Sequence, residues 1–363
     1  MKLNLWIGTY TQDILFGSGD ILHGKGKGIY HITFETRKNE IEDIVVNEGI
    51  VNPSYVIQSA DGAFLFAVNE TKEYKGMKSG YVSSFRVDHD SKRLSLISSR
   101  PTYGTDPCHL AVNQAMTHLF VANFMSGSIS MYSLTSEGEI SEEHTTVKHE
   151  GSSIHPTRQT GSHAHAVILS ADERWLFVPD LGLDKVMVYE IDYDTGSLSF
   201  HEDLTYHSRK GSGPRSIVFH PALAYAYIIN ELDSTIDVLS YDGKGRLTSL
   251  QSVSTLPENY EGNSTCADIR ISSCGKYLLG SNRGHDSIVC YTINQREGTL
   301  ETLGHTSTRG KCPRNFFTVD DTVLVANQDS DTITVFSLNE GNLKDTGKSI
   351  EIPTPVCVNN RMN

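Results

Sequence analysis

The chain has 363 residues and a formal net charge of −13 at neutral pH, from 31 basic and 44 acidic residues. Nucleic acid and anionic membrane surfaces are poor partners for such a chain, because like charges repel. The first ten residues contain one Lys and no long apolar run, and no window approaches the roughly 18–20 apolar residues of a membrane helix, so we expect neither a signal peptide nor a membrane span.

The residue composition favours a core built from strands. Apolar residues make up 38% of the chain, which contains 16 Tyr and 13 Phe, and aromatic residues are enriched in strands. The six cysteines form no CxxC pair and no regular framework, which predicts reduced, buried thiols in a cytoplasmic protein.

A unit of about fifty residues recurs along the chain. Each unit opens with a short strand-like run, often beginning with proline, and continues into a second apolar run. The starting positions are separated by 54, 56, 51, 52 and 47 residues, by subtraction. In chain order they are Pro53, Pro107, His163, Pro214, Cys266 and Pro313. A period of this size is typical of propeller blades of four strands each.

The two ends of the chain are predicted to form one further blade together. Residues 3–50 contain three strand-like runs but lack a leading strand, which the run Pro355-Val356-Cys357-Val358 is expected to supply. Closing the ring in this way removes exposed sheet edges. We therefore expect residues 1–363 to form a single seven-bladed β-propeller domain, all-β, with four antiparallel strands per blade and the C-terminal strand joining the N-terminal blade.

Residues 213–240 show the unit most clearly. The apolar run Ile217-Val218-Phe219 is followed by His220-Pro221 and by a second apolar run, a pattern typical of an antiparallel hairpin. In a hairpin the start of the first strand and the end of the second lie at the same edge. Arg215 and Glu231 are therefore predicted to be neighbours, although they are 16 positions apart (231 − 215).

Two insertions interrupt the repeat. Thr11 to Lys27 is a polar, Gly-rich insertion in the first blade, and residues 144–162 precede the fourth blade. Both join strands that should end near the same face of the ring. Long loops at such a face commonly form the walls of a site, although a plain solvated insertion is the alternative for each.

The repeat predicts a ring of charged residues at one mouth of the central channel. Arg, His and Glu are not turn formers, so their concentration at this face indicates a binding or catalytic site for a small anionic ligand. His163 and His165 alternate along one strand, so only one should face the channel, and the alignment favours His165. The predicted ring comprises Tyr55, His109, His165, Arg215, Asp268, Arg314, Glu70, Glu231, Arg283 and Gln328.

Structural interpretations of the same residues stay open. A lone strand His can be a hydrogen-bonded structural residue, and Arg215 and Arg283 can pair with Glu231 and hold the ring together without losing a functional role. A metal held by carboxylates in the channel is disfavoured by the arginines, whose charge opposes it.

The chain resembles the seven-bladed propeller lactonases, a family that includes bacterial propeller-type 6-phosphogluconolactonases and fungal carboxymuconate-lactonizing enzymes. The resemblance spans the whole chain. One departure is Ser216, because a His often follows the GPR motif in relatives. The matching motifs are IGTYT (residues 7–11), RQTGSHAH (158–165), VPDLGLDKV (178–186), GPR (213–215), NEL (230–232), SNRGHDSI (281–288) and PRNF (313–316).

The resemblance implies hydrolysis of 6-phosphogluconolactone, a step of the pentose phosphate pathway, with no cofactor and no metal. It implies catalytic roles for His165, Arg215, Glu231 and Arg283, with His165, or Glu231 if its pKa is raised, activating water. The expected substrate-binding residues are Arg158, His109, His163, His285, Arg314 and Glu70. A lactonizing cycloisomerase or a lactonase for another small acid is an alternative, and so is a non-catalytic interaction platform. The sequence does not predict the oligomeric state.

Overall fold

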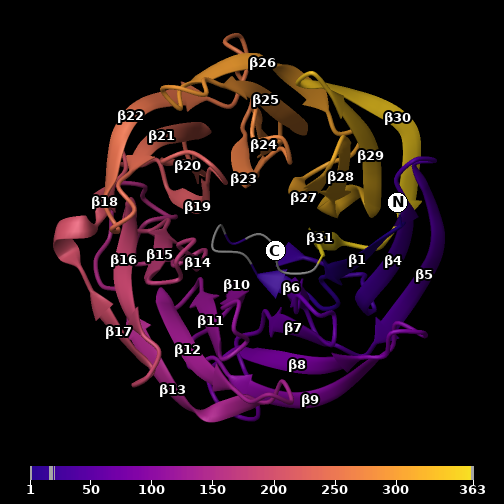
Figure 1. Cartoon of the computed structure of the whole chain (residues 1–363), viewed down its shortest axis with the longest axis vertical. Helices are drawn as coiled ribbons and strands as arrows, with labels where there is room; N and C mark the ends of the chain where they lie inside the picture. Colours follow the sequence, from indigo (N-terminus) through magenta and orange to yellow (C-terminus); the bar gives the residue numbers. More distant parts are fainter. Residues whose placement is uncertain (1, 16–18, 20, 361–363) are drawn as a thin grey trace.

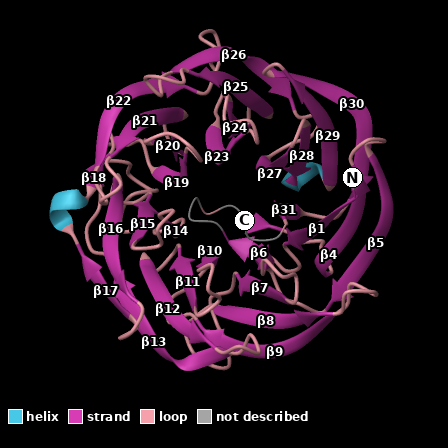
Figure 2. Ribbon diagram, viewed as in Figure 1, coloured by secondary structure: helices cyan, strands magenta, loops and turns pink. Residues whose placement is uncertain are grey.

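The structure, a computed structural model that describes residues 2–15, 19 and 21–360, is a ring of seven β-sheets around a central channel (Figure 1). Neighbouring strands of every sheet are antiparallel, with the innermost strand beside the channel and the outermost at the rim. Strands dominate the described chain, and its helical segments are two 3-10 turns, η1 (Glu202–Leu204) and η2 (Gln328–Ser330) (Figure 2). The prediction of a seven-bladed propeller is confirmed.

The first four blades use the two chain ends and residues up to 207. From the channel to the rim, the first blade contains β31 (Pro355–Asn359), β1 (Lys2–Thr9), β4 (Gly28–Glu35) and β5 (Glu40–Glu48). In the same direction, the second contains β6 (Pro53–Gln58), β7 (Phe64–Asn69), β8 (Tyr81–Val87) and β9 (Leu94–Pro101). The third contains β10 (Pro107–Val112), β11 (His118–Asn123), β12 (Ser128–Leu134) and β13 (Ile140–Lys148). The fourth contains β14 (Ile168–Leu169), β15 (Trp175–Asp180), β16 (Lys185–Asp192) and β17 (Ser197–Phe200), and β18 (Tyr206–His207) also pairs with β16.

The remaining three blades follow in chain order. The fifth contains β19 (Pro214–Phe219), β20 (Tyr225–Asn230), β21 (Thr235–Tyr241) and β22 (Leu247–Ser254). The sixth contains β23 (Thr265–Ile271), β24 (Tyr277–Arg283), β25 (Ser287–Ile293) and β26 (Leu300–Ser307). The seventh contains β27 (Pro313–Val319), β28 (Thr322–Asn327), β29 (Thr332–Asn339) and β30 (Asn342–Glu351). A small hairpin, β2 (Ile14–Leu15) and β3 (Ile21–Leu22), lies outside the blades.

The ring closes through the C-terminal strand, as predicted. β31 pairs antiparallel with β1, which places Trp6 opposite Asn359 and Ile7 opposite Val358. The side-chain amide of Asn359 also donates to the carbonyl of Val56, in the second blade (3.1 Å). Pairing one end of the chain with the other leaves no open edge between the first and last blades.

The hydrophobic core lies between neighbouring blades. Second strands such as β7 and β11 are buried on both faces, whereas the outermost strands, such as β13, expose many of their residues. One core cluster, for example, joins Phe66 and Val82 of the second blade to Leu119 and Tyr132 of the third. In the part of the chain that the structure describes, no helix has the length and apolarity needed to span a bilayer.

The innermost strand of the fourth blade is shorter than predicted. Residues 163–167 do not form a regular strand, and on the channel side β15 pairs with β14 and, through an isolated bridge between Ala164 and Asp180, with this segment. The carbonyl of Pro179 accepts from the amide of His165 (2.9 Å), so the nitrogen of Pro179 faces the same strand. Because proline has no amide hydrogen, the ladder is interrupted at this point.

Candidate active site

A β-bulge near the start of the innermost strand directs one side chain per blade into the channel. In four blades the pairing register skips the residue that follows the leading proline. A bulged residue is left out of the ladder, and its side chain turns out of the pleat. The four skipped residues, all of which line a cavity in the channel, are Ser54, Cys108, Arg215 and Arg314.

A second set of channel-facing residues follows a buried asparagine at the end of the second strand. The asparagines are fully buried, and four of their side-chain amides donate to loop carbonyls that precede the innermost strand: Asn69 to Val51, Asn123 to Thr102, Asn282 to Thr255 and Asn327 to Thr308. These hydrogen bonds fix the strand end against the loop. The residues that follow the repeated asparagine are Glu70, Phe124, Glu231, Arg283 and Gln328.

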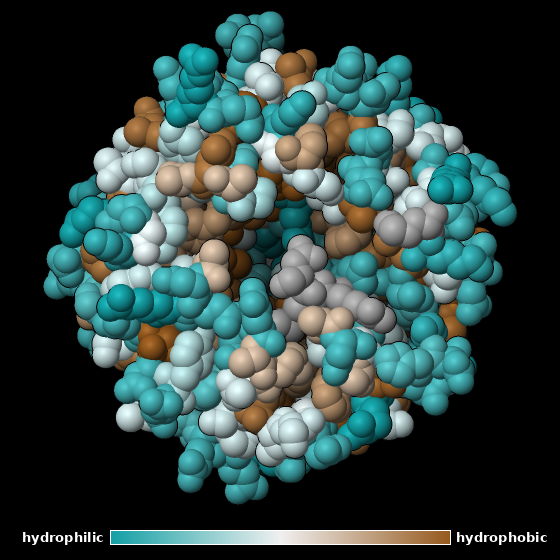
Figure 3. All heavy atoms as spheres, in the orientation of Figure 1, coloured by the Kyte–Doolittle hydropathy of each residue, from teal (hydrophilic) through white to brown (hydrophobic). Residues whose placement is uncertain are grey.

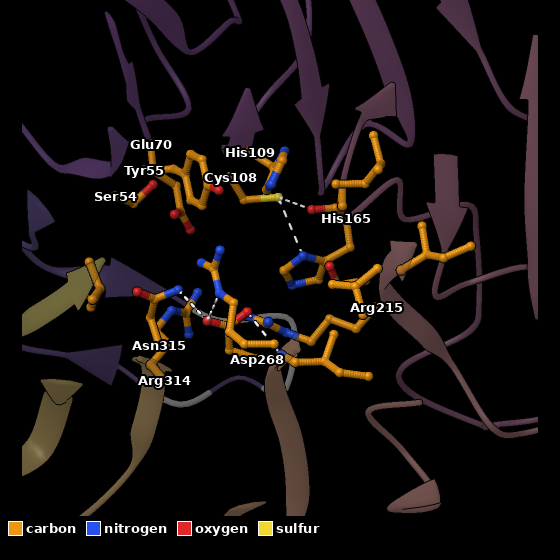
Figure 4. Close-up of a pocket in the computed structure, with 18 residues that line it drawn as sticks. Ser54, Tyr55, Glu70, Cys108, His109, His165, Arg215, Asp268, Arg314 and Asn315 are labelled. Carbon is orange, nitrogen blue, oxygen red and sulfur yellow. Dashed lines mark hydrogen bonds and ion pairs between the residues drawn. The ribbon is translucent and has the colours of Figure 1, made fainter. Parts of the chain in front are cut away.

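The channel contains two adjoining cavities. The outer cavity has a volume of about 480 Å³ and the deep cavity about 90 Å³. Both are lined by Glu70, Cys108, His165 and Arg314, which therefore lie where the two cavities meet. Figure 3 shows that the ring is hollowed at its centre, with hydrophilic residues inside the hollow, and Figure 4 shows side chains of several blades pointing toward the deep cavity.

Three arginines surround the carboxylate of Glu231. Oε1 of Glu231 lies 2.5 Å from Nη2 of Arg158, while Oε2 lies 2.8 Å from Nη2 of Arg283 and 3.0 Å from Nε of Arg215. Arg215 and Arg283 also donate to the carbonyls of Ala267 and Cys266 respectively. The predicted proximity of Arg215 and Glu231 is observed, and we call Arg158, Arg215 and Arg283 the arginine cluster.

The arginine cluster keeps Glu231 ionised. Burial alone would raise the pKa of this carboxyl, but the charges of Arg283, Arg158 and Arg215 hold it well below its usual value. Both oxygens of this carboxylate are occupied by guanidinium groups, which leaves neither free to take a proton from water. The condition under which we expected Glu231 to activate water, a raised pKa, is therefore not met, and Glu231 instead positions the three guanidinium groups.

His165 is a buried, neutral imidazole beside this cluster. Burial first, and then the positive charge of Arg215, lower its pKa well below the usual value, and the charge of Glu231 only partly opposes this shift. Its Nδ1 lies 3.8 Å from the sulfur of Cys108, and the ring of Phe124 contacts it edge-on at 5.2 Å. At neutral pH the ring therefore has a lone pair that can accept a proton.

Glu70 directly follows β7 of the second blade, whereas Glu231 directly follows β20 of the fifth blade, on another side of the ring (Figure 1). Oε2 of Glu70 accepts a hydrogen bond from the hydroxyl of Tyr10 (2.9 Å), and that hydroxyl accepts one from Nη2 of Arg314 (2.9 Å). Burial raises the pKa of Tyr10 well above its usual value, so the phenol stays protonated and can donate. No arginine pairs directly with Glu70 among the hydrogen bonds and ion pairs of the described residues.

Both insertions contribute to the wall of the outer cavity. Arg158 comes from the loop before the fourth blade, and Ile21 and Leu22 come from the β2–β3 hairpin. The carboxylate of Asp184 anchors the loop before the fourth blade, because it accepts hydrogen bonds from the hydroxyl of Ser153 (2.5 Å) and from the side-chain amide of Gln159 (2.7 Å). Residues 16–18 and 20 of the predicted Thr11–Lys27 insertion lie outside the described residues.

Three predicted substrate-binding residues lie away from the outer cavity. His109 lines only the deep cavity, because the bulge at Cys108 shifts it one position inward, where burial and nearby arginines lower its pKa to about 3. The ring of His163 hydrogen-bonds to the carbonyl of Phe124 (3.0 Å) and lines neither cavity. His285 hydrogen-bonds to Ser287 (2.6 Å) and also lines neither. None of the three lines the outer cavity, and their contact with substrate stays a prediction.

Tyr55 and Asp268 also lie deeper than expected. They line the deep cavity only, and the ring of Tyr55 packs 4.2 Å from that of His109. Asp268 accepts from Arg270 (3.1 Å) and Asn315 (2.7 Å). These residues fill the channel beneath the site.

The sequence reasoning missed Tyr10 and Cys108. Tyr10 follows β1 as Glu70 follows β7, so aligning the first blade on the ends of its strands would have found it. Cys108 follows Pro107 as Arg215 follows Pro214, so aligning on the proline would have selected it instead of His109. Within the described part of the chain, no group of three or more His, Cys, Asp or Glu side chains is placed to hold a metal ion.

Asp106, next to the site, is expected to make stability depend on pH. Burial first, and then the negative charge of Glu70, raise its pKa to about 7, and its Oδ2 has no hydrogen-bond partner in the described part of the chain. Because the folded state then binds the proton more tightly than the unfolded state, stability should fall as pH rises from about 4 to about 7. We expect the free energy of unfolding of the wild type to fall by about 2 kcal/mol between about pH 5 and pH 8. The Asp106→Asn variant, which cannot ionise at this position, should not show this fall. Urea unfolding at the two pH values measures this, and identical profiles would contradict it.

The family comparison agrees with the fold over almost the whole chain. The family described as "Lactonase, 7-bladed beta-propeller" matches residues 4–360. A 6-phosphogluconolactonase of Formosa agariphila is 31% identical, with 92% of this chain and 94% of the relative covered. A 6-phosphogluconolactonase of Bacillus subtilis is 28% identical, with 97% of each chain covered.

A solved structure with the same fold is the periplasmic gluconolactonase of Pseudomonas aeruginosa. It superposes with a TM-score of 0.90 at 31% sequence identity, covering 99% of this chain and 98% of that one. The described fold and the arrangement of blades are therefore shared over nearly the full length of both proteins.

Proposed function

This chain belongs to the seven-bladed β-propeller lactonase family, and from that membership and its relatives named 6-phosphogluconolactonase we propose that it hydrolyses 6-phosphogluconolactone to 6-phosphogluconate. The observation that carries the proposal is the outer cavity, in which a neutral His165 lies beside guanidinium groups held by Glu231. These are a proton acceptor and charge-stabilising donors, the two components that ester hydrolysis by water requires.

In the proposed reaction His165 acts on water and then on the leaving group. The imidazole takes a proton from a water molecule as the water oxygen bonds to the lactone carbonyl carbon, whose oxygen becomes an oxyanion. The bond between that carbon and the ring oxygen then breaks. The ring oxygen takes the proton from the imidazolium and becomes a hydroxyl, which restores neutral His165.

The arginine cluster is proposed to stabilise the oxyanion. Arg158 and Arg283 line the outer cavity, and both are fixed by Glu231, so their donors need no reorganisation when negative charge develops. Arg215 pairs with Glu231 from the deep cavity and supports the same arrangement.

The charge of the site supports an anionic substrate. The charged residues that line the two cavities are five arginines and four carboxylates, a formal charge of +1 (five minus four), or +2 when the exposed Asp329 at the rim is left out. This contrasts with a chain whose net charge is −13. A phosphate monoester carries close to two negative charges at neutral pH, and a guanidinium fork matches its oxygens. Arg314 is the proposed phosphate ligand, because it lines both cavities at their junction.

The proposal is tested by adding the enzyme to freshly generated 6-phosphogluconolactone and correcting for spontaneous ring opening. We expect rapid hydrolysis that EDTA does not inhibit, and slower hydrolysis of glucono-δ-lactone, which lacks the phosphate. No acceleration over the spontaneous rate would contradict the proposal. Turnover of a carboxymuconate or its lactone in place of both sugar lactones would do so as well.

A further inference from the structure

The outer cavity has two chemically different walls. The fifth and sixth blades and the loop before the fourth carry the arginine cluster, which presents hydrogen-bond donors. The second and seventh blades contribute the acceptors Glu70 and Gln328, each directly after the buried asparagine of its blade, and the seventh blade also contributes Arg314. We call Glu70 and Gln328 the acceptor wall.

Glu70 presents a carboxylate that can only accept hydrogen bonds. Arg314 donates to the oxygen of Tyr10, so the single hydroxyl hydrogen of Tyr10 points to Oε2 of Glu70. Oε1 accepts no hydrogen bond from the residues that the structure describes. This leaves one carboxylate oxygen available at a cavity in which the side chain is almost fully buried.

Backbone contacts fix the position of Glu70. Its amide donates to the carbonyl of Asn52 (2.9 Å), and the side-chain amide of Asn52 donates back to the carbonyl of Glu70 (3.2 Å). The other end of that Asn52 side chain accepts from the amides of Thr11 and Gln12, at 2.8 and 2.9 Å. The carboxylate is therefore held by a rigid segment and not by a mobile loop tip.

Gln328 provides an independent observation that the wall needs a donor. Its Nε2 donates to Asp329 (2.8 Å), which orients the amide, and its Oε1 is buried without a hydrogen-bond partner among the described residues. Gln328 is 3% exposed and lines the outer cavity. A buried acceptor without a partner costs free energy that a ligand hydroxyl can recover.

We propose that Glu70, with Gln328, recognises the hydroxyl groups of the substrate and so selects polyhydroxylated lactones over polycarboxylates. Hydroxyl groups are the donors that these acceptors lack, whereas a substrate carboxylate placed at a hydroxyl position would face the charge of Glu70 and be repelled. The inference rests on the proposed function and adds the residues that recognise the hydroxyl groups of the substrate. It applies equally to phosphorylated and unphosphorylated sugar lactones, because phosphate binding is assigned to Arg314.

The test compares two ligands of equal charge that differ in hydroxyl groups. 6-Phosphogluconate carries a carboxylate, a phosphate and a chain of hydroxyls, and 6-phosphohexanoate carries the same two anions without them. By calorimetry at neutral pH, Glu70→Gln should weaken binding of 6-phosphogluconate by about 10- to 100-fold and leave 6-phosphohexanoate binding unchanged or tighter. Glu73→Gln, an exposed position three residues further on, is the matched control and should change neither.

Gln328→Met, which removes the second acceptor but keeps the side-chain length, should lower the same preference if Glu70→Gln does not fold. The inference would be overturned if Glu70→Gln weakened binding of both ligands equally, or if the wild-type enzyme did not bind the hydroxylated ligand more tightly. Because these are binding measurements, they stay decisive if the hydrolysis assay is negative, and the two proposals fail separately.

Discussion

His165→Ala is expected to lower kcat for lactone hydrolysis by about 10²- to 10⁴-fold, the range that removal of a general base or acid produces. The imidazole is the neutral proton acceptor at the outer cavity, where burial and Arg215 keep its pKa well below neutral. Steady-state kinetics on 6-phosphogluconolactone measures the effect. KM should change much less than kcat, because the arginines that hold the anionic substrate stay in place.

His163→Ala is the matched control for this experiment. His163 lies two residues away on the same segment, but its ring bonds to the carbonyl of Phe124 and lines neither cavity. We expect near-wild-type kcat for this variant, with at most a small loss of stability. Wild-type kcat in His165→Ala, or an equal loss in both variants, would contradict the assignment of His165.

Glu231→Gln is expected to destabilise the fold by about 3–5 kcal/mol, because it leaves buried arginines without their counter-charge. Three guanidinium groups converge on this carboxylate, and Glu231 is 2% exposed. Urea unfolding monitored by tyrosine and tryptophan fluorescence measures the loss. Hydrolysis should also fall, since the arginine cluster is no longer held in place.

An exposed ion pair supplies the control for Glu231→Gln. Glu190 pairs with Arg174 at 2.7 Å, where the arginine side chain is 59% exposed, so Glu190→Gln should cost only about 0–1 kcal/mol. Inorganic phosphate should raise the stability of Glu231→Gln more than that of wild type, because the uncompensated arginines bind the anion in the folded state. Equal stability of the Glu231 and Glu190 variants would show that the buried cluster does not depend on its carboxylate.

The sequence alone determined the fold, because the signals for it are local. The fifty-residue period, the leading prolines and the run at Pro355 predicted the seven blades and their closure, as observed. The same local logic placed Arg215 beside Glu231, since a hairpin fixes both ends of its two strands. The alternation of apolar residues and the repeat period reflect strand pairing within a blade, which depends on residues that are close together in the chain.

Only the tertiary structure decided how residues of different blades meet. Arg158 reaches Glu231 across 73 positions and Arg314 reaches Tyr10 across 304, contacts that depend on the closed ring and on an anchored loop. A bulge, not the repeat period, placed Cys108 rather than His109 beside the outer cavity.

The protonation states were likewise decided by the three-dimensional arrangement. Desolvation and charge act through space, so three arginines lower the pKa of Glu231, while burial and Arg215 lower that of His165. The sequence determined which residue types the channel mouth contains. The assembled ring determined which of them is the carboxylate that holds the arginines and which is the neutral imidazole, because each role depends on burial and on neighbours distant in the chain.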